Sequence, residues 1–247
     1  MKKRTLLLFL AMLPFVAFSQ ADNDPTEGEP FIKRTTLEAG ITLATSGDLT
    51  NISLNGMQYW GFGRKNRRFK VGAGLRLNNY LGNDNLEYIT APAELTGDEA
   101  NIDTVTFTGT QISALNAFIA LRYDVTERWG LEFNIDLAGF SFGGEKTGNL
   151  TYNDQSEPLA TNATPTAGNL LLVGDNDIGN LNSEFLLTYR YKSNWRFKAG
   201  AMFNFNEYSL GGIVPAAYTA ANGTEIKEVR RYRSKNMTFG VGVNYVF

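Results

Sequence analysis

The chain has 247 residues, a formal net charge of −2, 13% aromatic and 19% charged residues, and neither Cys nor His. These absences exclude disulfides, thiol catalysis, thiolate metal sites and serine–histidine triads, and leave only carboxylates, Lys and Tyr for catalysis. The charge gives no reason to expect nucleic-acid binding. We therefore expect no enzymatic activity, no cofactor and no metal ion.

A secretory signal peptide is predicted over residues 1–19. Basic residues at positions 2–4 precede an apolar stretch over 6–17, which is too short to span a membrane as a helix. The tripeptide Ala17-Phe18-Ser19 fits a small-x-small cleavage site, so cleavage after Ser19 is expected. Residues 20–33 are polar and are predicted to be a periplasmic lead-in, and residues 34–247 are predicted to form one domain.

Eight segments alternate apolar residues with small or polar ones. A period of two predicts strands with one face toward lipid and the other toward a polar interior. In the second segment Gly56 and Gln58 interrupt the apolar face, which indicates a bulge. In chain order the segments are 35–45, 52–63, 69–78, 115–124, 129–137, 181–191, 195–206 and 237–247.

The connections alternate in length. Those at 64–68, 125–128 and 192–194 are short, whereas the ones after the third, fifth and seventh segments are long. All seven prolines lie outside the segments, where they delete no ladder hydrogen bond. The pattern predicts an all-β fold: an eight-stranded antiparallel up-and-down transmembrane β-barrel with short periplasmic turns and long extracellular loops.

Large aromatic residues flank the short turns. They are Trp60, Trp129, Trp195, Tyr123 and Tyr191, and they predict an aromatic girdle at the membrane interface. The alternative is that aromatics simply favour strands. That alternative does not explain why all three Trp lie at the same end.

Charged residues occupy inward positions of the predicted strands. Eight strands enclose a lumen just wide enough to be filled by side chains, and isolated buried charges are costly, so we expect a salt-bridged, plugged interior. The alternative is a narrow solute or proton path lined by Glu132, Asp136 and Arg122. The expected lumen charges are Glu38, Lys70, Arg76, Arg122, Asp124, Glu132, Asp136, Glu184, Arg190, Arg196 and Lys198.

The signal junction Phe18-Ser19-Gln20, the hairpins with Tyr before and Trp after a short turn, and the terminal Tyr245-Val246-Phe247 carry a resemblance. The chain resembles small outer-membrane barrels of the OmpA/OmpX type, in particular the PorT-like barrel proteins of Bacteroidetes, over residues 34–247. The resemblance implies that Tyr245 and Phe247 belong to the signal recognised by the barrel-assembly machinery. It also implies a Gram-negative outer membrane as the location.

Two basic segments indicate envelope contacts. Arg230, Arg231, Arg233 and Lys235 precede the last strand, where they predict contact with lipopolysaccharide phosphates or else a solvated strand extension. The turn over 64–68 either contacts an envelope partner or anchors the barrel. The sequence thus predicts a structural or interaction role in envelope integrity, adhesion or secretion-system assembly. The alternative is a channel or transporter for small or apolar solutes.

Overall fold

The computed structural model describes residues 35–62, 68–83, 86–91, 103–151, 158–172, 177–211, 218–219, 225–226 and 230–247. The predicted signal peptide, the lead-in and residues 64–67 of the basic turn lie outside this part of the chain. Within it, no helix is long and apolar enough to span a membrane.

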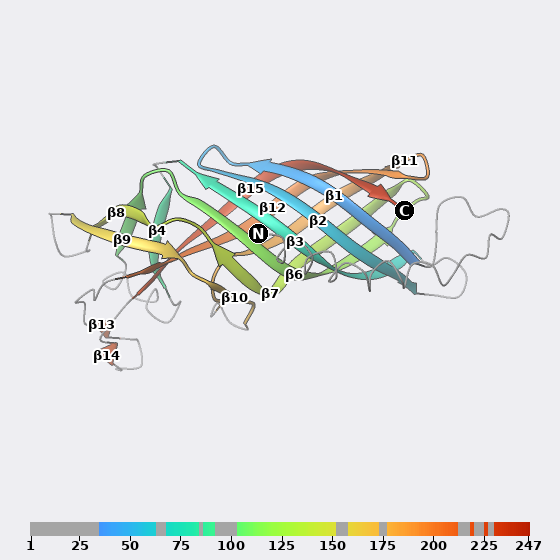
Figure 1. Cartoon of the computed structure of the whole chain (residues 1–247). Coiled ribbons are helices and arrows are strands. Elements are labelled where there is room, and N and C mark those ends of the chain that lie inside the picture. Colours follow the sequence, from blue (N-terminus) through green and yellow to red (C-terminus); the bar gives the residue numbers. More distant parts are fainter. Residues whose placement is uncertain are drawn as a thin grey trace, which may run out of the picture.

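Long antiparallel strands pair in a closed ring. Each strand pairs with its two neighbours in the ring, and the last strand pairs with the first from Glu38↔Val246 to Thr45↔Phe239. Figure 1 shows these strands running obliquely side by side, with short turns and the C-terminus at one end. In ring order the eight strands are β1 (Thr35–Thr45), β2 (Leu49–Phe62), β3 (Phe69–Gly82), β6 (Gln111–Asp124), β7 (Trp129–Phe142), β11 (Leu181–Tyr191), β12 (Trp195–Leu210) and β15 (Arg231–Val246).

The ring is polar inside and apolar outside. In β15 the side chains of Phe239 and Val241 point outward and are 61% and 63% exposed, whereas the alternate residues Thr238 and Asn244 are fully buried. This alternation follows from the pleat of a strand, which sends successive side chains to opposite faces. The predicted inward and outward sets of β1, β6 and β15 are found as expected.

A second closed ring of strands lies at the end away from the short turns. Beyond the point where β1 and β11 end, β15 pairs with β4 and β12 pairs with β9, and the four added strands pair in the order β4–β5–β8–β9. Since β12 and β15 also pair with each other as far as Ser209↔Arg231, six strands enclose this extension. The added strands, seen at the left of Figure 1, are β4 (Glu87–Ala91), β5 (Thr104–Phe107), β8 (Lys146–Thr151) and β9 (Leu159–Pro165).

Three short strands complete the described part of the chain. β10 (Gly168–Leu170) pairs with β7 beyond the end of β11, whereas β13 (Tyr218–Thr219) and β14 (Glu225–Ile226) pair only with each other. All the described strands except β13 and β14 belong to one 13-stranded sheet, which includes β10.

The structure corrects two sequence predictions, the number of strands and the position of the bulge. Eight strands form the first ring, but the count of eight is too low for the chain, because the described residues contain 15 and the long connections are not simple loops. The bulge expected near Gly56 is absent, since β2 pairs in constant register with β1 and β3. A register shift occurs instead between β6 and β7, where Phe118 pairs with Asp136 and Ala117 with Ala138, so that Leu137 is the extra residue.

Candidate functional site

The lumen near the short turns is filled by a network centred on Arg122. Its guanidinium donates to both carboxylate oxygens of Glu38, at 2.6 and 3.0 Å, and to Oε2 of Glu132, at 2.6 and 2.9 Å. Lys198 lies 2.7 Å from the other oxygen of Glu132, and Arg196 lies 3.3 Å from Glu38. These side chains come from β1, β6, β7 and β12, so charges from opposite sides of the ring neutralise one another across the lumen.

Arg76 forms the centre of a second network farther from the turns. Its Nη2 lies 2.5 Å from Asp136, and its Nη1 lies 2.6 Å from Glu184. The other oxygen of Asp136 accepts from the Asn116 side chain at 2.8 Å and from the backbone N–H of Asn182 at 3.0 Å. Burial of a carboxylate is tolerated only when its lone pairs are satisfied in this way.

One amide joins the two networks, and an ion pair and a hydrogen bond to the backbone lie between them and the turns. The Nδ2 of Asn134 donates to Glu132 at 3.0 Å and to Glu184 at 2.8 Å. At the turn end, Lys70 lies 3.2 Å from Asp124, and Arg190 donates to a backbone carbonyl in the β11–β12 turn at 2.7 Å. All eleven charged residues expected in the lumen are buried there, each at most 6% exposed.

A glycine makes room for the ring beneath Arg122. The Arg122 guanidinium carbon lies 3.8 Å from the centroid of the Tyr59 ring, within the range of a cation–π contact. A Cβ on Gly72 would lie 2.7 Å from that ring. Gly72 is therefore required by the close approach of Tyr59, and the ring in turn fixes the plane of the guanidinium.

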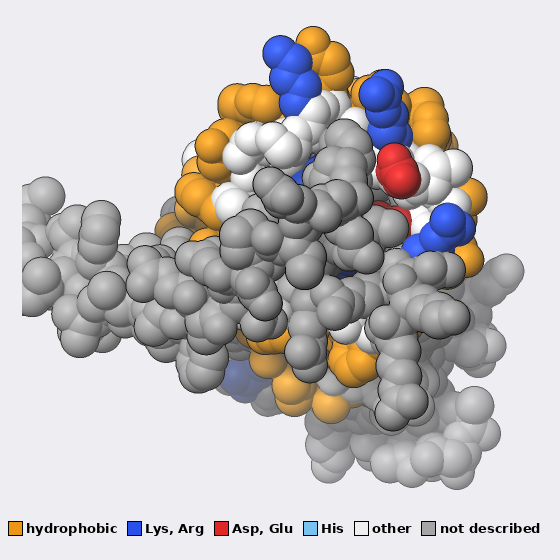
Figure 2. All heavy atoms as spheres, turned by 90° about the vertical axis from the view of Figure 1, so that its right-hand side faces the viewer, with side chains coloured by type: hydrophobic (Ala, Val, Ile, Leu, Met, Phe, Trp, Pro, Cys, Tyr) orange, Lys and Arg blue, Asp and Glu red, His pale blue; other side chains and the backbone are white. Residues whose placement is uncertain are grey.

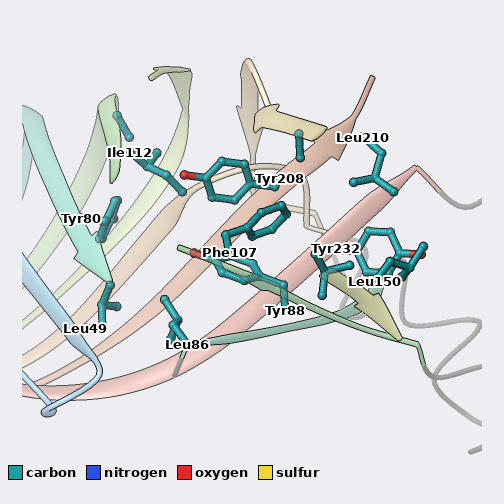
Figure 3. Packing of buried hydrophobic residues seen from close by; sticks show 13 residues of the cluster. Leu49, Tyr80, Leu86, Tyr88, Phe107, Ile112, Leu150, Tyr208, Leu210 and Tyr232 are labelled. Atoms are coloured by element: carbon teal, nitrogen blue, oxygen red, sulfur yellow. The ribbon is translucent and has the colours of Figure 1, made fainter. Parts of the chain in front are cut away.

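Apolar side chains fill the second ring and the adjoining mouth of the first. The rings of Tyr88, Phe107 and Tyr208 lie together in Figure 3, with centroids 4.8–5.4 Å apart. Burial raises the pKa of Tyr88 well above its ordinary value because the phenolate would be desolvated. Tyr208 donates to the backbone of Gln111 at 3.3 Å, which ties this core to β6. We call the following set the outer plug: Leu49, Tyr80, Leu86, Tyr88, Val105, Phe107, Ile112, Ala114, Leu150, Ala163, Tyr208, Leu210 and Tyr232.

The aromatic residues expected at the interface all point outward near the short turns. Trp129 packs on Tyr189 with ring centroids 4.8 Å apart, and Trp195 packs on Tyr245 at 5.2 Å. In Figure 2, which faces the end opposite the extension, hydrophobic side chains surround the ring and Lys and Arg side chains lie among them. The five girdle residues, Trp60, Trp129, Trp195, Tyr123 and Tyr191, are each 41–48% exposed.

Sequence reasoning missed a buried ion pair on the second ring. Glu207 is fully buried and pairs with Arg233 at 3.0 Å and Arg231 at 3.5 Å. Arg233 also donates to the carbonyl of Asp177. The Arg233 side chain is 3% exposed and stabilises the second ring, so it is not placed to contact lipopolysaccharide phosphates, and that contact stays a prediction for the rest of the basic segment.

The described residues hold no recognisable catalytic arrangement. The Glu132 and Asp136 carboxylates are each engaged by a cation and by an amide, so neither is available as a general base. No group of three or more Asp or Glu in this part of the chain could hold a metal ion. The first ring therefore has an interior filled by paired charged side chains and an outer surface of apolar side chains.

Comparison with known proteins gives only weak similarities. No family model matches the chain, and no curated protein does. Among solved structures, the chain is similar to Neisserial surface protein A, with 12% identity and a TM-score of 0.33 over 86% of this chain and 96% of that one. It is also similar to Ail, the attachment invasion locus protein of Yersinia pestis, with 11% identity and a TM-score of 0.32 over 86% and 97%. The toluene transporter TodX of P. putida matches with 9% identity and a TM-score of 0.23 over 87% and 90%. These values are too low to indicate what the chain binds.

Proposed function

We propose that this protein is a non-enzymatic β-barrel of a Gram-negative outer membrane, which anchors a folded extracellular extension with a structural or interaction role in the envelope. The first ring is the membrane-spanning barrel, and the second ring is the extension. The short turns face the periplasm.

The membrane proposal rests on the distribution of side chains in the first ring, which is polar inside and apolar outside, the reverse of a soluble protein. Its interior holds eleven buried charged residues, whereas outward residues such as Leu131, Phe185 and Val241 are 55–63% exposed. Soluble monomers rarely expose an apolar patch of more than a few hundred Å², and here the apolar side chains follow every strand of the ring. A barrel in a bilayer requires this distribution, with an apolar outer band and aromatic residues at the interface.

The structural role is supported by two barriers in series along the lumen. The Arg122 and Arg76 networks fill the half nearer the turns, and the outer plug fills the other end. A water or solute path would have to break charge-assisted hydrogen bonds and then cross a desolvated apolar core. The pairing of neighbouring strands continues around the ring, which also argues against a lateral opening for apolar solutes.

The channel hypothesis is tested by conductance of the purified full chain in planar bilayers. We expect no discrete current steps at neutral pH. Ohmic single-channel steps from unmodified protein would refute the closed lumen. Heat-modifiable migration on a detergent gel, expected for a folded barrel, serves as the control that the protein in the bilayer is folded.

Orientation is tested with epitope tags in two connections. A tag placed within 152–157, between β8 and β9, should be labelled on intact cells, whereas one within 63–67, between β2 and β3, should be labelled only after permeabilisation. The reverse pattern would invert the proposed topology.

Two partners follow from this proposal. Tyr245 and Phe247 point outward at the end of β15, with ring centroids 5.0 Å apart, where a barrel-assembly machinery could read them before the ring closes. Lys235 is exposed on β15 between the residues that pair with β4 and those that pair with β1, near the junction of the two rings, where lipopolysaccharide phosphates would lie.

A further inference from the structure

The outside of the first ring carries a concave apolar groove near the short turns. It has a volume of about 660 Å³ and crosses the outward faces of β7, β11, β12, β15 and β1. This volume falls within the roughly 300–1,000 Å³ typical of small-molecule sites. Its lining is apolar except where the groove approaches the turns.

The shape of the groove follows from a row of small side chains between large ones. Ala199 on β12 pairs in register with Val241 on β15, and these short side chains form the bottom. Leu187 and Leu43, their register neighbours on β11 and β1, form the two sides. Phe197 lies on the turn side of Ala199 and also lines the groove.

At the end of the groove nearer the turns, the lining residue Tyr189 contacts a positively charged side chain that lies just outside the groove. Tyr189 lines the groove with its ring against Trp129, and its hydroxyl oxygen lies 3.5 Å from Nη1 of Arg128. Arg128 itself is exposed in the β6–β7 turn. An apolar groove with a guanidinium beside one end matches a molecule with a hydrocarbon chain and a phosphate, since Arg binds phosphate in a bidentate manner.

We propose that this groove is a specific site for one acyl chain of a glycerophospholipid of the periplasmic leaflet, with the lipid phosphate at Arg128. The inference rests on the proposed insertion of the first ring in a membrane. It goes further in distinguishing one retained lipid from the surrounding annular lipids, which exchange freely. Because Tyr189 contacts Arg128 and the lining around Ala199 is apolar, the headgroup would lie at Tyr189 and the acyl chain over Ala199.

Quenching of tryptophan fluorescence by brominated phospholipid tests the site. Trp129 lines the groove and Trp60 does not, yet the two are similarly exposed, at 46% and 41%. Variants that retain only one of them, with Phe in place of the other two Trp, are titrated in detergent with brominated phosphatidylglycerol. We expect saturable quenching of Trp129 at low lipid-to-protein ratios and only weak, non-saturating quenching of Trp60.

A substitution that fills the groove distinguishes lipid binding in the groove from contact with bulk lipid. In the variant with Trp129 alone, Ala199→Phe should weaken lipid binding by about tenfold or more, because the ring displaces several methylenes of the chain. Ala117→Phe is the matched control, since Ala117 points outward on β6 away from the groove and should change nothing. Equal effects of the two substitutions would refute the site.

A charge variant tests the headgroup contact. Arg128→Gln should weaken binding by about threefold, as expected for an exposed ion pair. Arg68→Gln is the control and should leave binding unchanged, since Arg68 is half-buried beside the same turn and its guanidinium donates to the carbonyl of Val125.

The outcomes distinguish this inference from the proposed function. If Trp129 and Trp60 are quenched equally in detergent, or if cross-linking shows a second copy of the chain over the groove, the lipid site is wrong while the membrane barrel stands. If neither Trp is quenched in bilayers made of brominated lipid, the membrane insertion itself is wrong.

Discussion

Glu132→Gln is expected to destabilise the protein much more than Lys198→Met, although the two residues form one ion pair. Lys198 has its one ion pair among the described residues with Glu132, so removal of the carboxylate leaves a buried cation without an ion pair. Removal of Lys198 leaves Glu132 held by Arg122 at 2.6 Å. Loss of Glu132 should therefore lower the free energy of unfolding more than loss of Lys198, although the two residues pair with each other.

The magnitudes follow from the cost of an uncompensated buried charge. Loss of one partner from a buried pair costs about 3–5 kcal/mol, and Glu132→Gln falls in this class. Lys198→Met loses a charge-assisted hydrogen bond worth about 1.5–3 kcal/mol but also removes the desolvation cost of the ammonium, so we expect a net loss of about 1 kcal/mol. The double variant should be more stable than Glu132→Gln alone, with a coupling energy of about 1.5 kcal/mol or more.

The assay is urea unfolding of the full chain in phospholipid vesicles, followed by Trp fluorescence and by the heat-modifiable gel shift. Glu145→Gln is the matched control, because Glu145 is exposed beside β8 and its loss should change stability by about 0.5 kcal/mol or less. Equal losses for Glu132→Gln and Lys198→Met, or a double variant with the sum of both losses, would refute the reasoning.

Three further changes have defined outcomes. Ile119→Arg, outward on β6 and 37% exposed, should cost about 2–4 kcal/mol in vesicles because the guanidinium enters the apolar band. Gly72→Ala should cost about 1–3 kcal/mol in the same unfolding assay by displacing Tyr59, whereas Gly56→Ala, with nothing within 4 Å of the new Cβ, should not destabilise. The second ring should keep its full stability below about pH 10 and lose it as the pH rises, because burial raises the pKa of Tyr88 above that of the unfolded chain. Near-ultraviolet circular dichroism measures this loss, and a Tyr88→Phe variant with the same alkaline loss would exclude Tyr88 as its cause.

The sequence predicted the first ring well because every strand separates a polar interior from an apolar exterior. The predicted bounds of β1 and β11 agree with the structure, Thr35–Thr45 and Leu181–Tyr191. In those strands the contrast between faces extends over the whole segment. The bulge was placed wrongly because Leu137, the extra residue in β7, lies in a continuous apolar pattern that carries no local signal.

The second ring was missed because its strands are short and its apolar residues are few. In β5, Val105 and Phe107 alternate with two threonines over only four residues, which is below the length at which alternation can be distinguished from chance. The partners of the lumen charges were equally unpredictable from the sequence. Glu38 meets Arg122 at a separation of 84 residues, and that contact depends on the register of every strand between them.

The sharing of β12 and β15 has a consequence for how the chain acquires its structure. Both rings contain β15, which follows all the other described strands in the chain, and neither ring can close before β15 is present. The pairing of Glu38 with Val246 joins the two ends of the described chain, so it is a contact of high sequence separation and is expected to form late. Until then the apolar residues of β4, β5, β8 and β9 have no enclosed core to enter. Folding of the second ring and closure of the first are thus a single event, and a chain that stops before β15 would lose both.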